Sequence, residues 1–351
     1  MSATASFSPF HTGTLLPEAF ERELEDAIAT HLATACESPV AEHVRWHFGF
    51  HGDGVARRGK RLRPRLLLHV ATHEGATFDE AIDAALAVEC VHNSSLLHDD
   101  IEDGDDVRHG RTAVWARYGL PHGINAGDAA GALAYLALLR NRGGLSLDRV
   151  TAMQRALHGA HFAMSVGQSY DIAFESAPHV TMAAYIAMIE GKTAALFGAA
   201  CELGALCAGC DEGRAAAYRE FGCAYGRAFQ IRDDALGAPR LSGGAERVRA
   251  TDLARRKWCY PIVWALNGPP SPARDAIAVR YAFGRRLDRN DVRLIAQALE
   301  TLGAADAALA ACRATLIEAE QIAQRHQIDR DRTVRALFEY ASGARAAEAA
   351  S

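Results

Sequence analysis

Residues 81–103 read AIDAALAVECVHNSSLLHDDIED, an apolar stretch that ends in a group of carboxylates. Apolar side chains recur in it at spacings of three and four, which is typical of a helix face packed against a core. The recurring positions are Ala81, Ala84, Ala85, Val88 and Val91. The stretch therefore predicts a long core helix whose C-terminal end carries the carboxylates.

Segments rich in alanine and leucine continue the same spacing elsewhere, for example over residues 66–71. Residues 15–235 contain no convincing run of alternating β-branched residues, so we expect no strand there. We predict an all-α fold. The chain shows no internal repeat of fixed period, and one continuous helical bundle over residues 1–351 is the expectation. The ends, residues 1–17 and 341–351, are expected to be poorly ordered.

Helix-breaking residues mark the expected loops of this bundle. Glycine and proline both interrupt a helix, because one is too mobile and the other lacks the backbone N–H group. Such loops are predicted at residues 52–59, 119–123, 141–144 and 237–244.

The composition is that of a globular protein. Of 351 residues, 49% are hydrophobic and 23% are charged, and the formal net charge is −5. A nucleic-acid-binding protein would show a clustered basic excess, which is absent. Residues 1–17 lack the pattern of a signal peptide. No apolar run reaches the roughly 20 residues of a membrane span, so we expect a cytoplasmic protein.

The carboxylates at the end of the opening stretch predict a cation site. Asp99 and Asp103 share one helix face a turn apart, and Asp100 lies beside them. They face the negative end of the helix dipole as well as one another, so the arrangement costs stability without a cation. Magnesium binds such oxygens together with substrate phosphates. The alternative is a solvated acidic helix end.

Other charged segments fit a phosphorylated substrate. Asp233 and Asp234 close a second apolar helix, and the two acidic ends could face each other across a bundle. Basic residues that could bind phosphate stand in four places. They are Lys60 with Arg63, Arg108 with Arg111, Lys192, and the group Arg255, Arg256 and Lys257.

Taken in chain order, these segments resemble the trans-isoprenyl diphosphate synthases, also called polyprenyl synthetases, and in particular the geranylgeranyl diphosphate synthases. The resemblance covers about residues 55–262. It rests on Gly59-Lys60-Arg61-x-Arg63-Pro64, His92, Asp99-Asp100-x-x-Asp103, Arg108, Gly127-Asp128, Gln168 with Asp171, Gly191-Lys192-Thr193, Gln230-x-x-Asp233-Asp234, and Asp252-Leu253 with Lys257 before Pro261.

The resemblance implies a fold, a reaction and a set of site residues. The family fold is a helical bundle around a deep central cavity, usually in a homodimer. The reaction joins an allylic prenyl diphosphate to isopentenyl diphosphate and depends on Mg²⁺. Three Mg²⁺ ions are implied, and Mn²⁺ can substitute for them. The implied metal ligands are Asp99, Asp103 and Asp233. Asp100 and Lys192 also count as catalytic. The allylic diphosphate would be held by Arg108, Lys192, Thr193 and Lys257 with Gln230, and isopentenyl diphosphate by Lys60, Arg63, His92 and His109.

The sequence departs from the family pattern at three places. Gly237 stands where the second acidic motif usually has another Asp, and His109 replaces a second arginine after Arg108. The segment 242–246 lacks the usual Gly-Lys pair. These changes leave open a terpene-synthase-like enzyme that ionises one prenyl diphosphate and cyclises or hydrolyses it. A third hypothesis is that the protein is a non-catalytic regulatory subunit of an active synthase.

Product length is a further expectation. In the family, bulky aromatic residues four and five positions before the first acidic motif stop chain growth. Here those positions are Ser95 and Ser94, both small. The resemblance therefore implies an all-trans product of geranylgeranyl length or somewhat longer, rather than farnesyl diphosphate alone.

Overall fold

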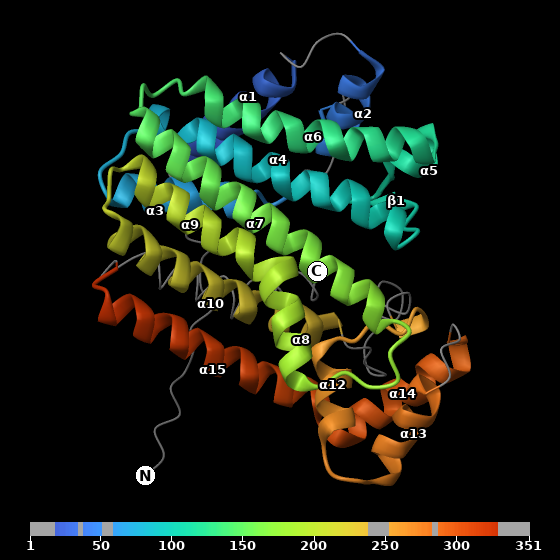
Figure 1. The fold of residues 1–351 in the computed structure, drawn as a ribbon. Helices are drawn as coiled ribbons and strands as arrows, with labels where there is room; N and C mark the ends of the chain where they lie inside the picture. Colours follow the sequence, from blue (N-terminus) through green and yellow to red (C-terminus); the bar gives the residue numbers. More distant parts are fainter. Residues whose placement is uncertain (1–17, 34–37, 51–58, 238–252, 283–286, 329–351) are drawn as a thin grey trace. The chain divides into compact units, whose positions relative to one another are not determined.

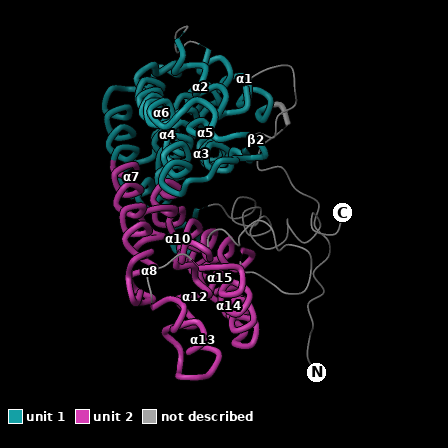
Figure 2. The backbone as a smooth tube through the Cα atoms, turned by 90° about the vertical axis from the view of Figure 1, so that its right-hand side faces the viewer, with its two compact units in different colours: residues 1–158, 199–219, 323–351 teal, residues 159–198, 220–322 magenta. Residues whose placement is uncertain are grey.

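The computed structural model describes residues 18–33, 38–50, 59–237, 253–282 and 287–328. The predicted tails 1–17 and 341–351 and the segment 242–246 lie outside this part. The described chain is almost entirely helical, as predicted (Figure 1). It divides into two compact units, of residues 1–158, 199–219 and 323–351, and of residues 159–198 and 220–322 (Figure 2). The expectation of a single domain stays a prediction.

The elements of the described residues stand in the following order along the chain. They are α1 (Glu18–Ala33), α2 (Pro39–Phe48), α3 (Leu62–His73), α4 (Phe78–Glu102), β1 (Val107–Arg108), β2 (Arg111–Thr112), α5 (Val114–Tyr118), α6 (Leu120–Arg140), α7 (Leu147–Phe174), α8 (Met182–Ile189), the π-helical turn η1 (Glu190–Ala194), α9 (Ala195–Cys207), α10 (Glu212–Gly237), α12 (Tyr260–Asn267), α13 (Pro272–Tyr281), α14 (Arg289–Leu302) and α15 (Ala304–Arg325).

Helix α4 forms the centre of the first unit, where it packs on α3 and α6. It begins at a capping box, in which Thr77 and Glu80 each bond the other's backbone N–H group. Every residue from Ala81 to Val91 is buried. A helix that is buried all round needs neighbours on all sides, and this explains why its apolar pattern is so broad.

Helix α6 lets α4 come close because its buried face is built from small residues. A Cβ atom at Gly127 would overlap the ring of His98 on α4, and one at Gly123 would lie 2.9 Å from Cδ1 of Ile101. The helix begins at Leu120, inside the predicted loop 119–123. Pro121 is tolerated there because the first turn of a helix leaves its N–H groups without helical partners. Gly119, at φ 100°, makes the break.

A two-residue hairpin after α4 departs from the expectation of no strand before residue 235. Val107 pairs with Thr112 and Arg108 with Arg111, in antiparallel register. His109 and Gly110 form the turn, with φ angles of 52° and 77°. Two consecutive positive φ angles are what a tight hairpin turn requires. The ladder is too short for an alternating pattern to be visible in the sequence.

In the second unit, α7 crosses η1 with backbone against backbone. A Cβ atom at Gly191 would lie 2.7 Å from the carbonyl oxygen of Ala163 and 3.0 Å from Cα of Gly167. A Cβ atom at Gly167 would overlap the amide nitrogen of Lys192. Only glycine at both positions permits this approach. The crossing brings the last turns of α7 beside Lys192.

Helix α10 packs on the start of α9 in the same unit, where Gly226 lies against Ala194 and Phe197. The ring centroid of Phe197 lies 5.5 Å from that of Tyr225 and 5.2 Å from that of Phe229. Among the described residues no single helix is long and apolar enough to cross a membrane, although α14 and α15, bent by 61°, meet that test as a pair.

We expect Gly167→Ala to lower the free energy of unfolding by about 1–3 kcal/mol, because the added methyl group has to separate α7 from η1. Gly159→Ala is the matched control, since Gly159 lies on the same helix with nothing within 4 Å of the new Cβ atom. It should be neutral or stabilise by up to about 1 kcal/mol, because alanine favours helices. Urea unfolding of both variants measures the difference. Equal effects would contradict the close crossing.

Candidate functional site

The first acidic motif lies at the C-terminal end of α4, as the sequence predicts. Asp103 is the C-cap residue, and its backbone N–H donates to the carbonyl oxygen of Asp99 at 2.8 Å. Both side chains are half-buried, and the last turn of α4 contains no basic residue. Two hard oxygen ligands one turn apart at a negative helix end suit Mg²⁺. Among the described residues, however, no three His, Cys, Asp or Glu side chains already form a metal site.

Asp100, between these two carboxylates, is buried and bonded to Arg108. Nε of Arg108 donates to its Oδ1 atom. Its Oδ2 atom is buried with no hydrogen-bond partner in the described chain. Burial raises the pKa of Asp100 to about 6, although the Arg108 guanidinium works in the opposite direction. Asp100 therefore fixes the orientation of Arg108.

Two of the predicted basic residues, Lys60 and Arg63, lie where α3 begins. Helix α3 starts at Leu62, directly after Lys60 and Arg61, so the positive end of its dipole faces this segment. Nη1 of Arg63 lies 3.2 Å from Nε2 of His92 on α4. Desolvation, together with Arg63 and Arg108, lowers the pKa of His92 well below its usual value. His92 is thus neutral and accepts a hydrogen bond from Arg63.

His109 lies beside the same segment. A Cβ atom at Gly59 would lie 3.9 Å from Nε2 of His109. Desolvation lowers the pKa of His109, and Arg108, Arg111 and Arg61 lower it further. The imidazole is therefore neutral at pH 7. The neighbouring Arg111 donates from Nη2 to the carbonyl oxygen of His47 at 2.8 Å, which ties the hairpin to α2.

The two serines before the motif differ in their surroundings. Ser94 is buried, and its hydroxyl donates to the carbonyl oxygen of Gly127 on α6 at 2.8 Å. Ser95 is half-buried, and its hydroxyl donates to the carbonyl oxygen of His92 at 2.8 Å within α4. The Ser94 hydroxyl thus links α4 to α6, whereas the Ser95 hydroxyl bonds within α4.

In the second unit two predicted lysines meet on one carboxylate. Nζ of Lys192 lies 2.6 Å from Oδ2 of Asp171 on α7, and Nζ of Lys257 lies 2.8 Å from the same atom. Lys257 also lies 3.2 Å from Oε1 of Glu175. Burial tends to raise the pKa of Asp171, but the two ammonium groups outweigh it and the pKa is lowered. The pair of lysines is therefore held by a buried anion.

A chain of hydrogen bonds joins Lys192's neighbour to the second acidic motif. The hydroxyl of Thr193 donates to Oε1 of Gln230 at 2.7 Å, and Nε2 of Gln230 donates to Oδ1 of Asp234 at 2.8 Å. Oδ2 of Asp234 accepts from the Tyr185 hydroxyl and from the backbone N–H of Tyr260, both at 2.7 Å. Asp234 is thus occupied within the protein, and both carboxylates of this motif are half-buried.

Sequence reasoning named Asp171 as a motif residue but gave it no role, and it did not find Tyr185. Both residues make contacts between segments far apart in the chain. The only sequence signal for Asp171 is its position one helical turn after Gly167, and Tyr185 has no such signal.

The acidic residues Asp99, Asp100 and Asp103 fall in the first unit with the basic start of α3. Asp233, Lys192 and Lys257 fall in the second. Asp252 lies outside the described residues.

A model of the polyprenyl synthetase family matches residues 51–300. A geranylgeranyl diphosphate synthase of Mycobacterium tuberculosis is 37% identical over 260 residues, which are 72% of this chain and 73% of that relative. A (2E,6E)-farnesyl diphosphate synthase of Mycobacterium bovis is 36% identical over 257 residues, 72% of this chain and 68% of the relative.

Among solved structures, a polyprenyl synthase from Caulobacter crescentus, crystallised with calcium and isoprenyl diphosphate, has a TM-score of 0.80 and 26% identity. The match covers 95% of this chain and 98% of that one. The family model spans more than half of the sequence, and the folds agree over nearly its whole length. The chain belongs to the polyprenyl synthetase family.

Proposed function

We propose that this protein is a trans-prenyltransferase that joins an allylic prenyl diphosphate to isopentenyl diphosphate and releases a longer all-trans prenyl diphosphate. The observation that carries the proposal is the meeting of Lys192 and Lys257 at buried Asp171. Two ammonium groups held side by side on one buried carboxylate suit the several anionic oxygens of a diphosphate. The named synthases among its relatives support the same activity.

The remaining candidate residues divide between the two substrates. Lys192, Lys257 and Arg108 bind the allylic diphosphate, Thr193 and Gln230 stand beside it, and Asp100 orients Arg108. Lys60, Arg63, His92 and His109 bind isopentenyl diphosphate. The hydrogen bond to the neutral His92 fixes the guanidinium of Arg63, and the start of α3 adds its dipole. Breaking the bond between carbon and oxygen leaves the allylic cation, and the diphosphate departs with the electron pair. The isopentenyl double bond attacks that cation, and a proton passes to the diphosphate.

Prenyl diphosphate synthases use Mg²⁺, and the donor set of this chain fits it. Asp99 and Asp103 are the ligands we assign to two ions and Asp233 to a third, and Mn²⁺ can replace Mg²⁺. When bound, the metal neutralises the charge that develops on the departing diphosphate. Asp234 contributes no ligand in this assignment, because three protein donors already occupy its oxygens.

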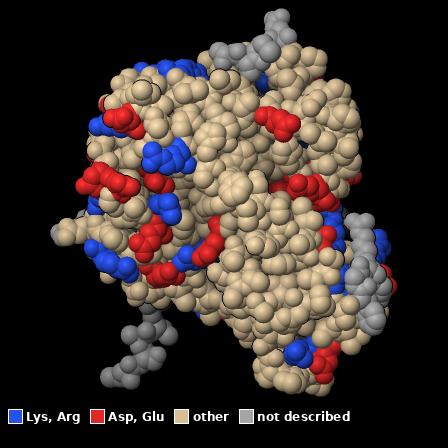
Figure 3. Space-filling view, viewed as in Figure 1, with Lys and Arg blue, Asp and Glu red and all other residues tan. Residues whose placement is uncertain are grey.

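We also infer a homodimer in the cytoplasm. The support is a set of large apolar side chains that α6 and α7, each considered by itself, expose to solvent. Leu136 and Leu139 on α6 are 58% and 63% exposed, and Phe162 on α7 is 74% exposed. Much of the surface seen in Figure 3 carries neither Lys and Arg nor Asp and Glu. A soluble protein rarely leaves such apolar side chains in water without a partner.

We expect purified protein with Mg²⁺ and farnesyl diphosphate to form a longer diphosphate only when isopentenyl diphosphate is present. The organic extract should contain the corresponding alcohol only after phosphatase treatment. Asp103→Asn should lower kcat about 100-fold or more, since it removes a metal ligand. Glu102→Gln, at an exposed neighbouring position, is the matched control and should keep full activity.

A hydrocarbon or alcohol formed without phosphatase and without isopentenyl diphosphate would contradict this proposal. That result would point to a terpene-synthase-like enzyme. Gly237, and the hydrogen bonds that engage Asp234 within the protein, favour this hypothesis. No turnover with farnesyl, geranyl or geranylgeranyl diphosphate would point to a regulatory subunit instead.

His109→Arg should lower KM for isopentenyl diphosphate about three- to tenfold at pH 8, because arginine keeps a charge that the desolvated imidazole lacks there. The pKa of His109 lies below its usual value, so the imidazole gains its charge only as the pH falls, and the advantage of arginine should shrink towards pH 6. His109→Gln is the uncharged control and should match the unaltered protein at pH 8. Equal KM values for arginine and histidine at both pH values would exclude this role.

Ser95→Phe should shorten the product by one or more isoprene units without lowering Tm, because Ser95 makes no contact with α6 through its hydroxyl. Ser94→Phe should shorten it too and also lower Tm, since the ring has to displace the bond to Gly127. Chromatography of the dephosphorylated products measures chain length, and Ser95→Ala is the control that adds no volume. An unaltered enzyme that makes farnesyl diphosphate alone would refute the predicted product length. Unchanged product length in both aromatic variants would mean that other residues stop chain growth.

A further inference from the structure

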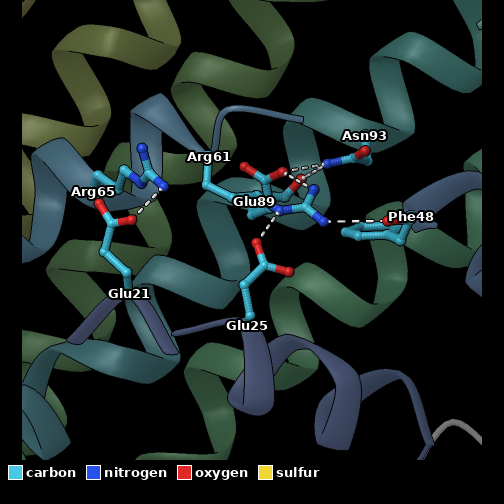
Figure 4. A network of polar contacts seen from close by, with 7 residues as sticks. All are labelled: Glu21, Glu25, Phe48, Arg61, Arg65, Glu89 and Asn93. Atoms are coloured by element: carbon cyan, nitrogen blue, oxygen red, sulfur yellow. Dashed lines mark hydrogen bonds and ion pairs between the residues drawn. The ribbon is translucent and has the colours of Figure 1, made fainter. Parts of the chain in front are cut away.

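Arg61, in the middle of the basic segment before α3, points into the protein rather than towards a substrate. It is 4% exposed, although Lys60 before it is exposed and Arg63 after it is half-buried. Its guanidinium donates from Nε to Oε1 of Glu25 at 3.0 Å and from Nη1 to Oε1 of Glu89 at 2.7 Å (Figure 4). Nη2 donates to the carbonyl oxygen of Phe48 at 3.2 Å. One side chain thus ties α1, α2 and α4 to the start of α3.

The backbone at Arg61 needs this anchor. Its φ angle is 50°, in the left-handed region that a residue with a side chain rarely adopts. As the N-cap residue of α3 it makes no side-chain cap hydrogen bond. The left-handed conformation turns the chain between Lys60 and Arg63. The buried guanidinium, held at three points, keeps the backbone in that turn.

The partner of Arg61 is itself fixed. Asn93 donates from Nδ2 to Oε1 of Glu89 at 2.9 Å and to the Glu89 carbonyl oxygen at 2.8 Å. Oε2 of Glu89 is buried and has no hydrogen-bond partner in the described chain. Burial tends to lower the pKa of Arg61, but Glu89 and Glu25 outweigh it and the pKa is raised. The pair is therefore a buried ion pair, in which desolvation offsets much of the attraction and removal of one partner would leave an uncompensated buried charge.

The position of Glu89 on α4 relates this anchor to the rest of the candidate site. His92, which contacts Arg63, lies three residues further on, so both residues lie on adjoining turns of one helix face. Asp99 lies ten residues beyond Glu89, or about 15 Å along the helix axis. Because α4 is rigid and buried, fixing Arg61 to Glu89 also fixes the distance from Lys60 and Arg63 to the acidic end of α4.

We propose that Arg61 and Glu89 are positioning residues, which set the register between the isopentenyl diphosphate-binding segment and the metal-binding end of α4. This inference rests on the proposed function. It distinguishes the middle residue of the basic segment from its neighbours: Lys60 and Arg63 touch the diphosphate, whereas Arg61 holds them in place. Loss of the anchor impairs binding of isopentenyl diphosphate and leaves the allylic substrate and the ionisation step unaffected.

The test is steady-state kinetics of Glu89→Gln and Arg61→Lys with farnesyl and isopentenyl diphosphates. Glu89→Gln should raise KM for isopentenyl diphosphate about five- to twentyfold, with kcat and KM for farnesyl diphosphate within about twofold. Arg61→Lys keeps the charge but loses the planar fork, so a smaller rise is expected.

Arg65→Gln is the matched control, because Arg65 lies on the same helix and pairs with Glu21 of α1 at 2.8 Å in a partly exposed ion pair (Figure 4). It should leave both KM values unchanged. Tm is measured for all three variants. A fall in Tm with unchanged KM for isopentenyl diphosphate in Glu89→Gln and Arg61→Lys would overturn the positioning role and leave the pair a purely structural contact.

Calorimetric titration with isopentenyl diphosphate separates failure of this inference from failure of the proposed function. An unaltered protein that neither condenses nor binds isopentenyl diphosphate overturns both. An unaltered protein that binds it, with the same affinity after Glu89→Gln, overturns the positioning role alone. An affinity lowered by the same factor as KM supports it.

Discussion

Helix α4 is buried on every side from Ala81 to Val91, and each buried carboxylate that it carries requires a cationic partner from another element. Asp83 accepts from the backbone and the guanidinium of Arg142, after α6. Glu89 accepts from Arg61 before α3, and Asp100 from Arg108 in the hairpin. Removing the partner of such a buried carboxylate would lower the free energy of unfolding of the protein by several kcal/mol. These three pairs therefore determine where the end of α6, the start of α3 and the hairpin contact α4.

The same requirement explains the arrangement of the candidate site in the first unit. The two pairs nearer the C-terminal end of α4 hold the elements that carry Lys60, Arg63, Arg108 and His109. Asp99 and Asp103 are only half-buried, whereas Asp83, Glu89 and Asp100 are buried. Along α4, burial thus separates the carboxylates paired within the protein from the two that we propose as metal ligands.

In the second unit a steric constraint has the corresponding effect. The glycine contact of α7 with η1 places Asp171 within reach of Lys192, and the same carboxylate receives Lys257 from the segment before α12. The π-helical turn at Glu190–Ala194 sets the direction of Lys192, and such turns often occur at functional sites. Asp234 joins α8, α10 and α12 through its three donors, which leaves Asp233 as the carboxylate of this motif that we assign to metal.

The sequence by itself determined the helical class, the long core helix and the placing of both acidic motifs at helix ends, because apolar periodicity and local capping are properties of neighbouring residues. It also determined the family, since the motif residues stand in a fixed order. Only the tertiary structure decided which charged residues are buried. Arg61 and Arg63 look alike in the sequence, as do Asp99 and Asp100, yet one of each pair is buried in an ion pair. Those roles depend on Glu89 and Arg108, which reach their partners only when separate segments pack around α4.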